Sequence, residues 1–110
     1  MFEINGEYWY IKFIDPYHPI LRMPNGELTI GTCDDYTKTI YLANNLEGNL
    51  LLKVLSHEIV HSAMFSYDVY LSYEQEEILA DIIATYGREI ITNANEMFKR
   101  LQLCRKCYEL

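Results

Sequence analysis

The sequence has no cluster of lysine and arginine, no apolar run long enough to span a membrane and no even set of cysteines. Nine basic residues against 16 acidic ones give a formal net charge of −7, so we expect no direct binding to nucleic acid. No run approaches the ~18 apolar residues of a membrane helix, so we expect no membrane association. Three cysteines do not make the paired framework of a small secreted protein.

We also expect no signal peptide, and the sequence contains no linker, internal repeat or low-complexity tract. Its first residues, MFEINGEYWY, include an acid at position 3 and no apolar stretch of the kind that signal peptides carry. Half of the 110 residues are apolar, which is typical of a folded globular chain. We therefore expect one soluble, cytoplasmic domain over residues 1–110, able to bury about two thirds of its unfolded surface.

The first 43 residues have the patterns of β-strands and tight turns. Asn5-Gly6 is a hairpin signal between strands at Phe2–Ile4 and Glu7–Ile14. Further strands are predicted near Glu27–Cys33 and Thr37–Ala43, each bounded by turn residues. With the helices that follow, this pattern predicts an α+β fold, in which an antiparallel sheet of three or four strands packs on a helical layer.

The rest of the chain has helical patterns. Leu50–Phe65 is apolar nearly all round, which is typical of a buried helix. Ser72 and Gln75 have the spacing of a capping box and predict the start of a second helix. An amphipathic pattern continues to about Leu103, and one unbroken helix of ~31 residues would span ~46 Å. Because this is long for a domain of this size, we expect a break or bend at Gly87.

The predicted helix 50–65 carries the motif His57-Glu58-Ile59-Val60-His61. His57 and His61 are about one turn apart, so both imidazoles leave the same face and can bind one zinc ion at ~2.0–2.1 Å. Glu58 lies about 100° round the helix from His57, beside the expected metal. This placement suits a general base that deprotonates a water.

A catalytic zinc site takes three protein ligands, so a third ligand is needed. A third histidine in the pattern HExxHxxGxxH is excluded, because Met64 and Tyr67 stand at the glycine and histidine positions. The other source is a glutamate on the second helix.

Three glutamates lie close together there, at Glu74, Glu76 and Glu77. Only Glu77 has an acid one turn on, at Asp81, which could accept the other ring N–H of a zinc-bound histidine. We therefore predict Glu77 as the third ligand and Asp81 as the histidine partner. Glu74 and Glu76 are interpreted as solvated residues at the positive end of the helix dipole.

The motif His57-Glu58-Ile59-Val60-His61, followed by Glu77-Ile78-Leu79-Ala80-Asp81, resembles the HExxH…ExxxD arrangement of gluzincins. Its short spacing resembles that of the ImmA/IrrE-type metallopeptidases and related small phage proteins. The resemblance implies zinc ligands at His57, His61 and Glu77, a general base at Glu58 and a histidine partner at Asp81. It also implies that the strand Thr39, Ile40, Tyr41 and Leu42 is the sheet edge along which an extended substrate lies. The implied substrate is a protein, such as a helix-turn-helix repressor.

Two other functions remain open at this point. The first is a regulatory protein that keeps the zinc site and acts by binding a partner. The second is a structural zinc domain, against which Glu58 argues, because a structural site closes its fourth position and needs no base.

Two further groups of residues are candidates for chemistry. Cys104 and Cys107, with Cys33 and His18, could form a second zinc site of the Cys₃His type. One of three tyrosines could stabilise an oxyanion, and the sequence does not choose among Tyr67, Tyr70 and Tyr73.

Overall fold

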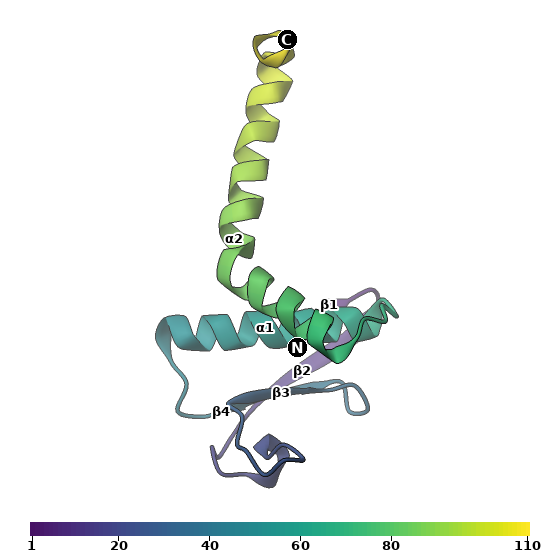
Figure 1. Cartoon of the computed structure of the whole chain (residues 1–110), viewed down its shortest axis with the longest axis vertical. Coiled ribbons are helices and arrows are strands. Elements are labelled where there is room, and N and C mark those ends of the chain that lie inside the picture. Colours follow the sequence, from purple (N-terminus) through teal and green to yellow (C-terminus); the bar gives the residue numbers. More distant parts are fainter.

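The computed structural model describes all 110 residues and has the predicted α+β fold, with a four-stranded sheet packed against helices (Figure 1). The elements in chain order are β1 (Phe2–Ile4), β2 (Glu7–Ile14), the 3₁₀ helix η1 (Pro19–Leu21), β3 (Gly31–Asp34), β4 (Thr39–Ala43), α1 (Gly48–Ser66), α2 (Tyr73–Leu103) and the 3₁₀ helix η2 (Arg105–Tyr108).

The sheet is mixed, so the prediction of an antiparallel sheet is wrong in one pairing. The strand order is β1-β2-β4-β3. The pairs β1–β2 and β3–β4 are antiparallel hairpins, whereas β2 and β4 run parallel, with Ile11 opposite Ile40. Turn residues fix pairing within each hairpin, as the positive φ angles of Asn5 and Gly6 show. The pairing between hairpins depends instead on the long connection from β2 to β3, which no local pattern describes.

The predicted substrate edge, the strand Thr39, Ile40, Tyr41 and Leu42, is not an edge. These residues belong to β4, which lies between β2 and β3 and is hydrogen-bonded on both sides. Thr39, Ile40 and Leu42 are buried accordingly. The edge strand with more contacts to α1 is β3. It pairs with β4 on one side, and its other edge is free.

The core lies between the sheet and α1 and is small. Its buried apolar residues are Leu21, Ile40, Leu42, Ala43 and Leu46, with Val54, Leu55 and Ile59 of α1 packed against them. α1 is buried on one side only, so the expectation of a helix buried all round is wrong. Leu50 and Leu52 are exposed near its beginning, where neither the sheet nor α2 covers them.

The first hairpin is fixed to the end of α1 by side-chain contacts. The Trp9 indole N–H donates to the Ser66 hydroxyl at 2.7 Å, and the Asn5 amide donates to the Ser66 carbonyl at 2.9 Å. The Trp9 ring is fully buried and stacks on Phe65, with 6.3 Å between the ring centroids. The hairpin therefore holds α1 at a fixed place over the sheet.

α2 begins with the predicted capping box. The Ser72 hydroxyl accepts from the Gln75 backbone N–H at 3.1 Å, and the Gln75 side chain accepts from the Ser72 N–H at 3.2 Å. The helix then runs for 31 residues without a break. It changes direction where it leaves α1 (Figure 1), so α2 is one bent helix and is not broken at Gly87.

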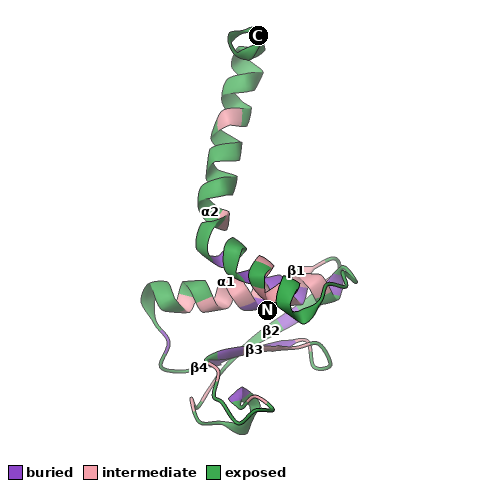
Figure 2. Ribbon diagram, viewed as in Figure 1, coloured by how far each residue is buried: buried purple, intermediate pink, exposed green.

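The second half of α2 projects from the rest of the molecule. We call residues 88–103 the arm; it carries no buried residue, and it is exposed (green in Figure 2) except at the half-buried Met97. The radius of gyration is 17.4 Å, against about 13 Å for a compact chain of this length. Neither helix has the length together with the apolar character that crossing a bilayer requires.

Candidate metal centre

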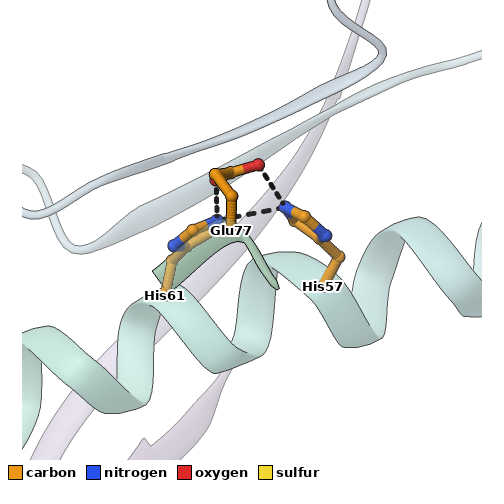
Figure 3. A group of neighbouring side chains, drawn as sticks. All are labelled: His57, His61 and Glu77. Carbon is orange, nitrogen blue, oxygen red and sulfur yellow. Dashed lines mark hydrogen bonds and ion pairs between the residues drawn. The ribbon is translucent and has the colours of Figure 1, made fainter. Parts of the chain in front are cut away.

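His57 and His61 of α1 face Glu77 of α2, and the three side chains converge (Figure 3). The Nε2 atoms of the two histidines are 3.1 Å apart. The Glu77 carboxylate lies 2.8 Å from His61 Nε2 through Oε1 and 3.3 Å from His57 Nε2 through Oε2. Because one ligand atom from each residue lies within 4.8 Å of the others, the cluster could hold a metal ion.

The other ring nitrogen of each histidine contacts a carboxylate. His57 Nδ1 lies 2.9 Å from Asp81 Oδ1, and His61 Nδ1 lies 2.9 Å from Glu76 Oε2. When each Nδ1–H donates to its carboxylate, the Nε2 lone pair is left directed at Glu77. The two carboxylates thus select the ring tautomer that a metal ligand needs.

Asp81 has the partner role predicted for it, whereas the interpretation of Glu76 as a solvated residue is wrong. The Glu76 side chain is 21% exposed and pairs with His61. α1 and α2 run antiparallel, so the first histidine meets the later acid and the second histidine meets the earlier one. Asp81 is predictable because it lies one turn from Glu77 on the same helix face. Glu76 does not have this spacing from Glu77, so the sequence pattern does not indicate its contact with His61.

Small residues on α2 allow the two helices to approach. Ala80 and Ala84 are the only buried residues of α2, and both follow Glu77 within its next two turns. Beyond them, the Arg88 guanidinium donates to the Ser56 hydroxyl at 2.7 Å. These contacts therefore hold the two helices together from the histidine positions toward the beginning of α1.

Glu58 lies under the cluster, between α1 and the sheet. Glu58 is 7% exposed and lines the same cavity as His57 and His61. Burial raises the pKa of Glu58; the two histidines oppose this rise, and the nearby Glu77 carboxylate adds to it. Glu58 is therefore a carboxyl group that takes up a proton more readily than one in water, as a general base requires.

A glycine brings β3 close to the motif helix. A Cβ atom at Gly31 would lie 2.8 Å from Val54 Cγ1 and 3.4 Å from Glu58 Cγ. Because any larger side chain would push β3 away from α1, Gly31 sets the distance between the edge strand and Glu58.

A cavity of about 510 Å³ opens between β3 and the two helices. Its floor carries the histidines, Glu58, Glu76 and Glu77, and Gly31, Thr32 and Cys33 form one wall. The segment before β3 forms the other wall, with Ile20, Arg22, Met23 and Pro24. The cluster is therefore open to an extended ligand lying beside β3.

The structure separates the three candidate tyrosines. Tyr73, the first residue of α2, lines the cavity with the cluster, Tyr70 lines a second and smaller pocket, and Tyr67 lines neither. Of the three, only Tyr73 shares the cavity with His57, His61 and Glu77.

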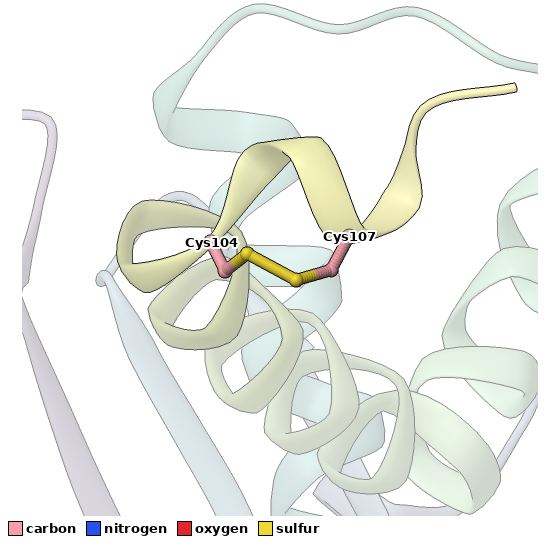
Figure 4. The surroundings of a disulfide bond; sticks show 2 residues. All are labelled: Cys104 and Cys107. Atoms are coloured by element: carbon pink, nitrogen blue, oxygen red, sulfur yellow. A yellow bond between two sulfur atoms is a disulfide. The ribbon is translucent and has the colours of Figure 1, made fainter.

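The proposed Cys₃His site is not formed. Cys104 and Cys107 are joined by a disulfide at the end of the arm (Figure 4). Cys33 lies in β3, where burial raises the pKa of its thiol and keeps it protonated. His18 accepts from the Ile20 N–H at 3.1 Å and caps η1. The four residues therefore lie in three separate parts of the molecule and cannot bind one metal ion.

Comparisons of the chain with family models, curated proteins and solved structures gave no match. The function is therefore argued from the geometry of the cluster and its cavity.

Proposed function

We propose that the protein is a zinc metallopeptidase. The observation that carries the proposal is the convergence of His57, His61 and Glu77, with a carboxylate behind each histidine and Glu58 beside the cluster. A structural zinc site has four protein ligands, whereas this set has three and opens into a cavity.

The donor set fits zinc. Two imidazole nitrogens and one carboxylate oxygen are a known ligand set of catalytic zinc, and calcium or magnesium would favour oxygen donors alone. Bound there, zinc would act as a Lewis acid that polarises the scissile carbonyl and lowers the pKa of a water.

Glu58 supplies the proton transfers. Its carboxylate accepts a proton from the attacking water and passes that proton to the nitrogen of the leaving amine. The raised pKa of Glu58 favours the first transfer, and its place in the cavity wall puts the carboxyl group beside the substrate. Tyr73, which lines the same cavity, is the candidate donor to the developing oxyanion.

The free edge of β3 aligns the substrate. In the β3–β4 pair, Ala43 N–H donates to the Ile30 carbonyl, so the same alternation turns Thr32 and Asp34 toward β4. The backbone groups of Gly31 and Cys33 then point away from β4 toward the cavity, where the Gly31 carbonyl also accepts from the Thr29 hydroxyl at 3.1 Å. An extended peptide adds as a strand along this edge and passes over His57 and His61.

The substrate is a protein or peptide in extended form. The resemblance to ImmA/IrrE-type metallopeptidases makes a helix-turn-helix repressor the first protein substrate to assay.

Metal analysis is the first test. The purified chain should hold about one zinc per molecule, and chelation should lower its melting temperature, because a ligand of the native state stabilises that state. A chain that takes up no zinc after loading would overturn the proposal.

The second test replaces the base. Glu58→Gln keeps the shape of the site, so it should retain zinc and lose at least ~10²-fold in cleavage of an extended-peptide library read by mass spectrometry. Glu74→Gln is the matched control at an exposed position and should cleave like the wild type. A zinc-loaded chain that cleaves nothing, and whose cellular effect survives Glu58→Gln, would favour the regulatory binding protein instead.

A further inference from the structure

An apolar stripe runs along α2 and is covered over only part of its length. In the first half, Ala80 and Ala84 lie in this stripe and pack against α1. Beyond Arg88, which contacts Ser56 of α1, the same spacing continues along the arm, which projects away from α1 and the sheet. The apolar residues there, which we call the arm stripe, are Ile90, Ile91, Ala94, Met97, Phe98 and Leu101.

The arm stripe is exposed to an unusual degree for residues of this kind. Ile90 is 55% exposed, and Ile91 and Phe98 are each 59% exposed. The opposite face of the arm is polar, with Thr92, Asn95 and Lys99. Burial of the stripe would remove several large apolar side chains from water, which favours association.

We propose that a second copy of this chain covers the arm stripe, with the two arms packed antiparallel about a twofold axis. Gly87, Ile90, Ala94, Met97 and Leu101 follow one another at intervals of three and four residues, the spacing of a helix–helix seam. An antiparallel pairing centred between residues 95 and 96 places Ile90 opposite Leu101 and Ala94 opposite Met97 of the second copy. The first layer pairs two branched side chains of equal volume, and the second pairs the small Ala94 with the longer Met97.

The charges along α2 favour the antiparallel direction. Residues 73–89 have five acids and one base, a formal charge of −4, and residues 97–110 have four bases and one acid, a formal charge of +3. An antiparallel pairing brings the basic end of each copy toward the acidic half of the other. A parallel pairing would place the two basic ends together, at a cost in repulsion.

The same charges argue against a lipid surface as the occupant. A helix that lies on an anionic bilayer has a strongly basic polar face, whereas the polar face of the arm includes Glu89 and Glu96. The rest of the chain, residues 1–87, has 13 acids and four bases, a formal charge of −9, which an anionic surface would repel.

Sedimentation of the full chain tests the association. The mass should rise from 13.0 kDa toward twice that value between about 1 and 100 µM, the range expected of a seam of a few layers. Ile90→Glu should weaken the association at least 10-fold, while Thr92→Glu, the same change on the polar face, should leave it within about 3-fold. Both positions are exposed, so circular dichroism should show the wild-type helix content in both.

Cysteine cross-linking tests the direction of pairing. Ile90→Cys alone and Leu101→Cys alone should give no covalent dimer beyond the unmodified chain, and a mixture of the two should give one. In the antiparallel register the two copies of position 90 lie ~16 Å apart along the helix, too far for a disulfide.

Three results would overturn the proposal. The first is a mass that stays at 13.0 kDa up to about 100 µM. The second is a covalent dimer of Ile90→Cys alone, which shows parallel pairing. The third is a monomer that binds phosphatidylserine vesicles through the arm and loses this binding in Ile90→Glu, which makes a membrane the occupant.

Discussion

The two halves of α2 have one apolar pattern and different surroundings. In residues 73–87 the stripe includes Glu76, Glu77 and small alanines, and it packs against α1. In the arm the stripe has larger side chains, most of them exposed, and lies away from α1 and the sheet. The comparison shows that Glu76 and Glu77 can be partly buried because they pair with histidines of α1. The stripe of the arm has no comparable partner within the chain.

The largest effect is expected at Glu77, which contacts both histidines and has no counterpart in the arm. Glu77→Ala removes a carboxylate that lies 2.8 Å from His61 Nε2, and the cluster then has two ligands. Zinc affinity should fall by more than the ~100-fold that marks the upper range for residues behind the ligands. Isothermal titration with zinc measures this loss. Glu74→Ala, at an exposed position of the same turn, is the control and should bind zinc like the wild type.

The next effect concerns the carboxylates behind the histidines. Glu76→Ala and Asp81→Ala should each lower zinc affinity or activity by ~10–100-fold, because each leaves a ring N–H without its acceptor. Glu76→Gln keeps an acceptor oxygen and should lose less than Glu76→Ala. If Glu76→Ala titrates like the wild type, the contact with His61 has no role in metal binding.

A matched pair of alanines tests the packing difference. Ala80 is fully buried and Ala94 is exposed, and the two lie 14 residues apart in the same stripe. Ala80→Leu should destabilise the fold by about 1–3 kcal/mol, because the extra atoms separate α1 from α2. Ala94→Leu should change the free energy of unfolding of the monomer by less than about 0.5 kcal/mol. Urea unfolding at low protein concentration measures both, and equal effects would erase the distinction between the halves.

The smallest effect is expected at Gly87, where the halves meet. Gly87→Ala should stabilise α2 by about 0.5–1 kcal/mol, since alanine loses less backbone freedom in a helix. Its Cβ atom would lie 3.2 Å from Ile83 Cγ2, and the exposed Ile83 side chain can shift by a few tenths of an ångström. Urea unfolding measures the change in the free energy of unfolding. A loss of stability in Gly87→Ala would show that the helix needs glycine at this position.

Local patterns predicted local structure well. The Asn5-Gly6 turn, the capping box at Ser72 and the helical spacing of His57 and His61 depend on neighbours in the sequence, and the structure has all of them. Glu77 was found by pairing it with Asp81 one turn on, and the structure brings both residues to the histidines.

The errors arose where distant segments meet. The place of β4 inside the sheet depends on the connection between two hairpins, and no turn residue encodes it. The role of Glu76 depends on the antiparallel packing of α1 on α2, which brings it to His61. The exposure of Leu50 follows from the bend of α2 away from α1, and an apolar residue in a helix pattern does not reveal what covers it.

The contact between Trp9 and Ser66 gives the protein a built-in optical reporter. Trp9 is the only tryptophan in the chain, and its emission arises from one buried site between the first hairpin and the end of α1. Separation of the hairpin from α1 would expose the indole to water and shift its emission to longer wavelength. Phe65, which stacks on Trp9, also lines the cavity. A peptide lying in the cavity therefore touches the ring next to the fluorophore, so binding can be followed without a label.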